Sequence, residues 1–168
     1  MKSKYKVILI IIILCSAIIG ETLPLTQRYF HDQDLEYNYT RGTYLIVMSD
    51  ASLESILRDE STGDFIHFKQ TQGYEVKLVN INDVATSGDI NNLLNQFLQS
   101  YLAADPLLEY VLLIGDVNGN YDIPSYSIDS YNEEEEDVTD YPYTFFNNDP
   151  LNPEFFIGRW SIRNEEDL

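Results

Sequence analysis

The stretch YVLLIGD at residues 110–116 decides the fold class of this chain. Its first five residues are apolar or aromatic, with no polar alternation, which predicts a strand that is buried on both faces. Strands of this kind belong to parallel sheets that lie between helices. Gly115 and Asp116 end the run and place a carboxylate at the carboxyl end of the strand, the edge where open α/β sheets bind ligands.

Upstream of this strand, residues 89–104 carry the clearest helical pattern in the chain. Their apolar side chains follow the spacing i, i+3, i+4, i+7, which forms one continuous stripe along a helix. Ser87 or Asp89 can cap its start, and Pro106 stands just past its end. The stripe consists of Ile90, Leu93, Leu94, Phe97, Leu98, Tyr101 and Leu102.

The flanking residues extend the alternation of strands and helices. This order predicts an α/β domain over residues 43–168, with a mainly parallel sheet flanked by helices and right-handed crossovers. Residues 117–153 are expected to be mostly loop, and residues 165–168 look like the opening turn of a helix, so we expect the domain to be incomplete. The further strands are expected at 43–48 (TYLIVM), 74–79 (YEVKLV) and 154–160 (EFFIGRW), and the further helices at 53–57 and 64–72.

The first twenty residues have the layout of a secretory signal peptide. Three lysines among the first six residues form a positive region, residues 7–19 are apolar or small, and Gly20 precedes a polar residue. The apolar run has 13 residues, fewer than the roughly 18 of a membrane-spanning helix, so a retained anchor is the weaker interpretation. We therefore expect a secreted or cell-surface protein, in which residues 21–42 form a lead-in or the end of a pro-region.

The composition is strongly acidic, with 28 Asp and Glu residues against 10 Lys and Arg and a formal net charge of −18. Removal of residues 1–20 takes away three lysines and no acids, which moves the net charge to about −21. This charge argues against binding to nucleic acid or anionic membranes, and it suits an exported protein or one that binds cations. We expect no nucleic-acid partner and no membrane association after signal cleavage.

Signatures of nucleophilic catalysis are scarce outside the predicted signal. Cys15 is the one cysteine and lies in the predicted signal, so the mature chain is expected to have no disulfide, thiolate metal site or cysteine nucleophile. The motifs GxSxG and HExxH do not occur, and the glycines after residue 114 lack the spacing of a dinucleotide site. His31 lies in the lead-in and His67 in a predicted helix, where a lone histidine is usually a surface or core-edge residue.

Oxygen ligands for a cation are more plentiful. Asp116 follows the buried strand, and Asp149 and Glu154 bracket a proline-containing loop before the last strand. With a main-chain carbonyl near Phe146 or Asn152, they form a set of the hard ligands that Ca²⁺ prefers, provided that the last strand lies beside the 110–114 strand. The alternative is a turn at Asp-Pro whose carboxylates are solvated.

Two further acidic features fall in the loop-rich region. The run at residues 133–137 is better explained as a solvated loop whose charges repel than as a second calcium site. Asp140 either caps a turn or orients a partner group ahead of an aromatic-rich strand.

A series of short motifs follows one order along residues 43–168. They are FKQTQGYEV at 68–76, YVLLIGD at 110–116, Ile-Pro at 123–124, TDYPY at 139–143, FIGRW at 156–160 and EEDL at 165–168. Each motif alone is weak, but together and in this order they resemble the gingipain family of caspase-like cysteine peptidases.

The resemblance implies the amino-terminal sub-domain of a caspase-like fold, in a secreted or cell-surface endopeptidase that works through a His–Cys dyad. That dyad would lie beyond Leu168, so no catalytic residue is carried over. The implied partners are the remainder of its own catalytic domain and, for the full-length enzyme, protein or peptide substrates. The resemblance also implies one structural Ca²⁺, held by Asp116, a carbonyl near Phe146, Asp149, a carbonyl near Asn152, and Glu154.

Two alternatives stay open at this point. One is a non-catalytic, calcium-stabilised binding or surface module of the same fold. A His and a Cys encoded downstream of Leu168 would favour the peptidase over this module. The other is a receiver-like signalling domain, which is disfavoured because Asp50 stands alone at the end of the first strand, where such a domain needs clustered acids.

Overall fold

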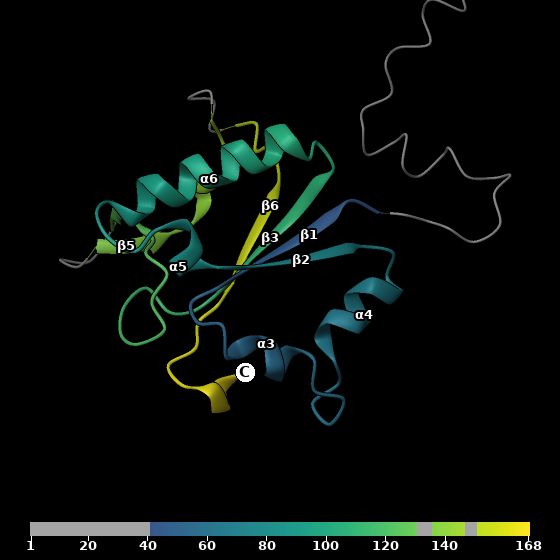
Figure 1. The fold of residues 1–168 in the computed structure, drawn as a ribbon. Helices are drawn as coiled ribbons and strands as arrows, with labels where there is room; N and C mark the ends of the chain where they lie inside the picture. The colour runs from purple at the N-terminus through teal and green to yellow at the C-terminus, as the bar shows by residue number, and fades with distance from the viewer. Residues whose placement is uncertain (1–40, 131–135, 147–150) are drawn as a thin grey trace, which may run out of the picture. The chain divides into compact units, whose positions relative to one another are not determined.

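The computed structural model describes residues 41–130, 136–146 and 151–168, and these contain a four-stranded sheet. The strands lie in the order β2-β1-β3-β6, and every neighbouring pair is parallel (Figure 1). The prediction of an α/β fold with a mainly parallel sheet is therefore confirmed. The strands are β1 Thr43–Met48, β2 Glu75–Asn80, β3 Leu108–Ile114 and β6 Phe156–Trp160.

Helices pack on both faces of this sheet (Figure 1). Alternate side chains of a strand point to opposite faces, so the two central strands build a separate core on each side. The odd-numbered apolar residues of β1 and β3 pack with Leu94 and Leu98 of one helix. The even-numbered residues pack with Leu53, Leu57 and Ile66 of two others. The helices are α6 Ile90–Ala104 and the short α5 Ile81–Val84 on the first face, and α3 Leu53–Leu57 and α4 Phe65–Thr71 on the second.

Local signals explain where these helices begin and end. The Asp89 carboxylate accepts the N–H of Asn92 at 3.1 Å and caps α6, as one of the two predicted caps. The Asp64 carboxylate accepts the N–H of His67 at 2.8 Å and caps α4. Gly73 follows α4 with a φ of 91°, a conformation that glycine adopts without the steric cost of a Cβ atom. Burial of Leu94 or Leu98 stabilises the docked α6 by about 1.5–3 kcal/mol each.

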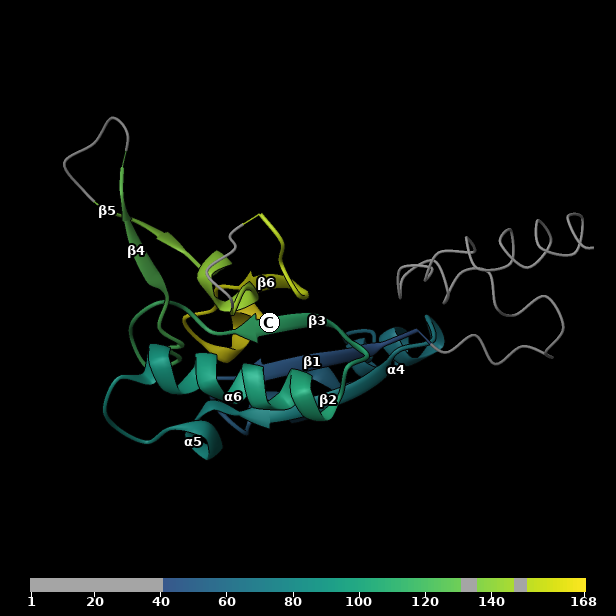
Figure 2. The same cartoon turned by 90° about the horizontal axis from the view of Figure 1, so that it is seen from above.

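The loop-rich region holds more regular structure than predicted. β4 (Tyr126–Asp129) and β5 (Glu136–Thr139) form an antiparallel hairpin that projects away from the sheet (Figure 2). The prediction of a loop at residues 133–137 is therefore wrong for Glu136 and Asp137, although both side chains are exposed to solvent as predicted. Residues 133–135 lie outside the described part of the chain. Most side chains of the hairpin are exposed, so no buried face leaves a period-2 pattern in the sequence.

The segment after Asp140 also differs from its prediction. An aromatic-rich strand was expected there, but Tyr141–Thr144 forms a 3₁₀ helix, η1. Pro142 explains the difference, because its fixed φ suits the first turn of a helix and its missing N–H weakens a strand. The expected helical turn at the end of the chain is the 3₁₀ helix η2, Glu165–Asp167.

The predicted signal peptide at residues 1–20 and most of the lead-in at residues 21–42 fall outside the described residues, which begin at Arg41. Among the described residues, no helix combines the length and apolar character needed to cross a membrane.

Candidate functional site

Arg159 lies on β6 and directs its guanidinium to the loops at the carboxyl edge of the sheet. Its side chain is only 9% exposed. Because arginine is almost never buried unless it is paired, this side chain needs partners within the fold. Nε donates to Oδ2 of Asp140 at 2.8 Å, and Nη2 donates to Oδ1 at 2.7 Å. Two parallel bonds between a planar guanidinium and a carboxylate give this contact both strength and a fixed geometry.

The same guanidinium also binds main-chain carbonyls of the loop that follows β3. Nη1 donates to the carbonyl of Ile123 at 2.7 Å and to that of Gly115 at 3.1 Å, and it lies 3.3 Å from that of Asp116. Nη2 lies 3.4 Å from the carbonyl of Pro124. Arg159 therefore ties the beginning of this loop to its end.

Asp140 and Tyr143 reach this region together, because residues three apart in a 3₁₀ helix lie above one another. Tyr143 is fully buried, and its hydroxyl donates to the carbonyl of Pro124 at 2.7 Å and lies 3.1 Å from Oδ1 of Asn91 on α6. Burial raises the pKa of the Tyr143 hydroxyl, so it stays protonated as a donor. The Ser125 hydroxyl donates to Oδ1 of Asp140 at 2.9 Å.

Asp116, the predicted strand-end ligand, is held by its own loop. Its N–H donates to the carbonyl of Tyr121 at 2.8 Å, and its carbonyl accepts the N–H of Ile123 at 2.8 Å. The Asp116 carboxylate accepts the N–H of Val117 at 2.8 Å, and this bond lowers its pKa. The exposed Arg163 places Nε 3.4 Å from the same carboxylate.

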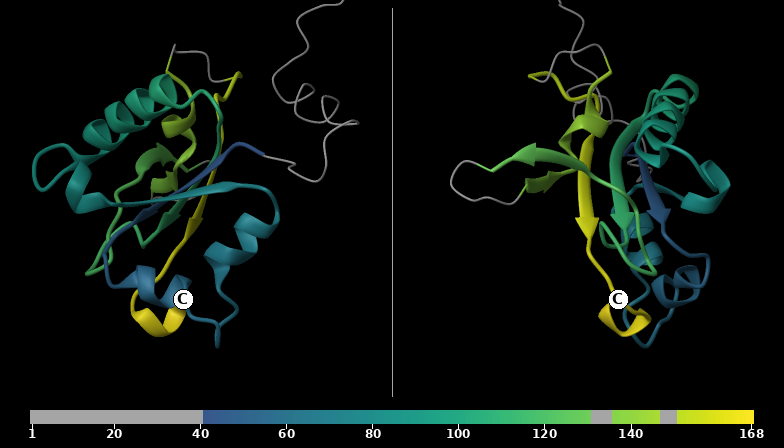
Figure 3. Two further views of the ribbon diagram at one scale, coloured as in Figure 1. Left: turned by 45° about the vertical axis from the view of Figure 1, so that its right-hand side comes forward. Right: turned by 90° about the vertical axis from the view of Figure 1, so that its left-hand side faces the viewer.

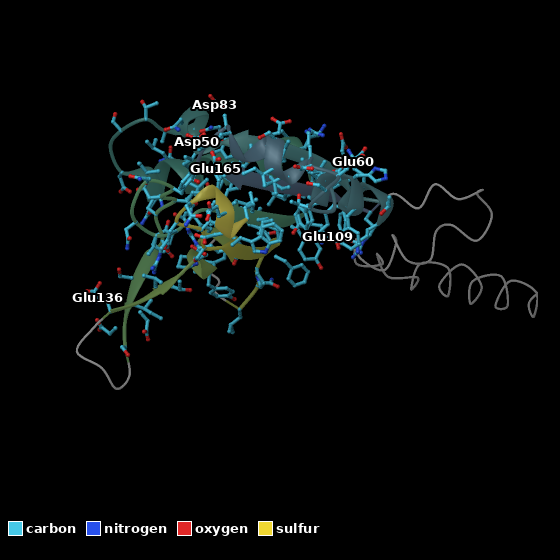
Figure 4. The ribbon with its side chains drawn as sticks, turned by 90° about the horizontal axis from the view of Figure 1, so that it is seen from below. Asp50, Glu60, Asp83, Glu109, Glu136 and Glu165 are labelled. Carbon is cyan, nitrogen blue, oxygen red and sulfur yellow. The ribbon has the colours of Figure 1, made fainter. Side chains whose placement is uncertain are left out.

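The strand order changes direction between β1 and β3, and open α/β sheets commonly bind ligands outside the carboxyl ends of such a pair. In this chain the segment after β6 crosses that position. Glu165 accepts a hydrogen bond from the Ser52 hydroxyl at 2.9 Å and lies 3.4 Å from the Tyr121 hydroxyl. Figure 4 shows Glu165 and Asp50 at this end of the sheet and Glu109 at the other end. Glu165 thus connects the segments that follow β1 and β3, at the place where a ligand would otherwise bind.

Four of the sequence motifs meet at Arg159. Residues 110–116 and 123–124 supply carbonyls, 139–143 supply Asp140 and Tyr143, and 156–160 supply the arginine itself. No role was predicted for Arg159 from the sequence, although one signal was present: it is the single charged residue in the strand FIGRW. A charge in such a strand needs a partner once the strand packs in a sheet.

The structure separates Asp116 from the other predicted calcium ligands that it describes. β6 runs parallel to β3, with Phe156 opposite Tyr110 and Trp160 opposite Ile114. The loop before β6, with Phe146, Asn152 and Glu154, therefore enters at the amino edge of the sheet, whereas Asp116 leaves at the carboxyl edge. At about 3.3 Å per residue the two edges are about 20 Å apart. Asp149 lies outside the described residues, and within those described no group of three or more His, Cys, Asp or Glu side chains could hold a metal ion.

The described residues also contain no cysteine, since Cys15 precedes them. His67 is exposed on α4, on the face opposite to α6, while Arg159 contacts the loops at the strand ends. The arrangement at Arg159 contains donors and acceptors that satisfy one another, so it can hold the loops in place.

A sequence model of peptidase family C25 matches residues 37–168. No curated protein matches the chain significantly.

Three solved structures share the fold. A crystal structure of the Arg-specific cysteine proteinase gingipain R (RgpB) has 28% sequence identity and a TM-score of 0.55, over 75% of this chain and 26% of that one. A complex of the Porphyromonas gingivalis RgpB pro- and mature domains has 26% identity and a TM-score of 0.55, over 74% and 26% of the two chains. A structure described only as a protease, at 18% identity and a TM-score of 0.51 over 74% and 25%, supports the fold alone. The chain thus spans about a quarter of the length of the structures it matches.

Proposed function

Because the chain belongs to peptidase family C25, the gingipain family, we propose that it is the N-terminal part of a cysteine endopeptidase and supplies scaffold to it. The observation that carries this proposal is the convergence of four family-like motifs on the buried Arg159. All of the polar groups described there are paired with one another, as expected of a structural element. The proposed reaction is peptide-bond hydrolysis by a His–Cys dyad in the remainder of the catalytic domain, acting on protein or peptide substrates.

The scaffold role predicts that this chain alone is inactive. Purified residues 21–168 contain no thiol, so they should not hydrolyse casein or short chromogenic peptides, with or without a thiol reductant. The longer protein that carries this chain with the rest of its C25 domain should hydrolyse them, and a thiol alkylator should stop it. Reductant-dependent turnover by residues 21–168 would contradict the scaffold role. An inactive longer protein would instead favour a non-catalytic module.

The proposal includes export through residues 1–20, which the amino-terminal sequence pattern supports. The sequence of the first residues of the exported protein tests it, because cleavage of the signal removes Cys15 and the three lysines near residue 1.

We also propose that a calcium ion stabilises the loop between η1 and β6, with Asp149, the Glu154 carboxylate and the carbonyls of Phe146 and Asn152 as its ligands. The chemistry of this donor set supports the proposal, since all four supply hard oxygens. The N–H of Glu154 donates to the carbonyl of Thr144 at 2.8 Å, which brings the two ends of the loop together.

This proposal predicts a higher melting temperature in excess calcium than in excess chelator. Calcium at a hundred times its dissociation constant should add about 2.7 kcal/mol to the free energy of unfolding. Glu154→Gln should remove most of this difference. Asp116→Asn is the matched control and should keep it, because Asp116 lies at the other edge of the sheet. Equal melting temperatures in calcium and chelator would rule the ion out.

A further inference from the structure

β6 is the outer strand of the sheet (Figure 3), and the large side chains on one of its faces are exposed. Phe156, Gly158 and Trp160 share the face that carries α3 and α4, since they lie opposite the even-numbered residues of β3. Phe156 is 53% exposed and Trp160 is 38% exposed. Two large aromatic side chains on one edge strand form the kind of apolar surface that usually marks an interaction site.

Gly158, between these two aromatic residues, has no explanation within the described chain. Its φ is not positive, and a Cβ atom built on it would meet nothing within 4 Å. Glycine weakens a strand, and within one it often marks a place where another backbone approaches closely. No such backbone is present among the described residues. The open space above Gly158, which we call the notch, therefore indicates a missing neighbour.

The aromatic packing on this face also stops at β6. Rings of Tyr74, Tyr44 and Tyr110 form a compact cluster with centroids 5.5, 5.7 and 5.6 Å apart, and Phe156 stacks on Tyr110 at 5.1 Å. The first three rings lie among the strands and α4, whereas Phe156, at the outer end of the cluster, is half exposed. A further neighbour could continue this packing.

A pocket of about 170 Å³ adjoins the other end of the open strand. It lies between α3, α4 and β6, and Trp160, Phe68, Leu168 and Phe65 are among its lining residues. Trp160 packs on Phe65 with a centroid distance of 4.6 Å, so one side of its ring is already anchored. The notch, the half-exposed rings and the pocket are continuous along β6.

We propose that this face of β6 is the docking surface for the remainder of the C25 catalytic domain, whose backbone approaches closest at Gly158. This inference rests on the proposed function and names the partner's contact surface. The chain spans about a quarter of the matched peptidase structures, so three quarters of such a protein is available as the neighbour. A second copy is a poor occupant, because each copy carries a net charge of −18 and two copies would repel.

The test compares Gly158→Val in two proteins, this chain alone and the longer protein that contains the rest of the C25 domain. In the chain alone, valine fills open space and favours the strand, so the melting temperature should rise by about 2–5 °C. In the longer protein the same side chain meets the docked backbone. There the melting temperature should fall by at least about 5 °C, or the unfolding should separate into two transitions. Ser127→Val, on the exposed β4, is the matched control and should have the same effect in both proteins.

A rise in melting temperature in both proteins would overturn the proposal, because it would mean that nothing covers the notch. A chain that is dimeric by light scattering, and monomeric after Gly158→Val, would overturn it in favour of a second copy. Peptidase activity of the unaltered longer protein is measured separately. If that protein is active and Gly158→Val is harmless, the docking surface alone is wrong. If it is inactive, the proposed function fails, and the comparison of melting temperatures still decides the docking surface.

Discussion

Replacing Arg159 with alanine is expected to lower the free energy of unfolding by about 3–5 kcal/mol, the cost of breaking a buried ion pair by removing one partner. The variant leaves the Asp140 carboxylate largely buried without its guanidinium. It also removes the hydrogen bonds that Nη1 of Arg159 donates to the carbonyls of Gly115 and Ile123. Because domains are typically stable by only about 5–15 kcal/mol, this loss is a substantial fraction of the total stability. Urea denaturation followed by Trp160 fluorescence measures the loss.

Arg58→Ala provides the matched control for this prediction. Arg58 also pairs with a carboxylate at 2.8 Å, that of Glu54, but both side chains are about half exposed. An exposed pair four residues apart on a helix contributes about 0.3–0.5 kcal/mol. Arg159→Lys should fall between the two, since lysine keeps the charge but cannot make the forked contact with Asp140. If Arg159→Ala costs no more than Arg58→Ala, the buried arginine is not what holds the loops.

The sheet and its main helices could be predicted because their residues carry the pattern of a core. The strand at 43–48 and the helix at 53–57 have the predicted bounds, and α6 begins one residue after the predicted start. β3 begins at Leu108, two residues before the predicted start. The prediction missed this start because Glu109, which is buried, interrupts the apolar run in the sequence. The Glu109 carboxylate accepts hydrogen bonds from Gly42 N–H and Arg41, partners that are distant in sequence. A charged residue whose partners are distant cannot be recognised as buried from local sequence.

The arrangement at Arg159 could not be predicted for the same physical reason. Its partners lie 19 residues away at Asp140 and 44 residues away at Gly115, and only the folded sheet brings them together. Four of the six motifs did mark the correct segments, since they contain Arg159, its partner Asp140 and the carbonyls that it binds. The grouping of Asp116 with Glu154 failed on direction rather than adjacency. β3 and β6 are neighbours, as the calcium site required, but in a parallel pair the end of one strand and the start of the next lie at opposite edges.

Gly115→Ala is expected to destabilise the chain by about 2–6 kcal/mol, because overpacking and backbone strain each cost about 1–3 kcal/mol. A Cβ atom at Gly115 would lie 2.5 Å from the carbonyl oxygen of Tyr121 and 3.0 Å from Cβ of Ser49. That oxygen cannot retreat freely, since it accepts the N–H of Asp116 at 2.8 Å. The φ of Gly115 is +156°, which side chains rarely adopt. The clash would displace the loop after β3 that Arg159 ties together, so Gly115→Ala and Arg159→Ala should both disturb this loop.

Gly119→Ala separates the two contributions to this loss. Gly119 lies in the same loop with a φ of +97°, but a Cβ atom there would meet nothing within 4 Å. Alanine at this position should therefore cost only the strain, about 1–2 kcal/mol. The difference between the two variants measures the close approach of the Tyr121 carbonyl to Gly115. An equal loss would show that the contact can relax, and the glycine in the GD pair that ends β3 would then be required only for its backbone conformation.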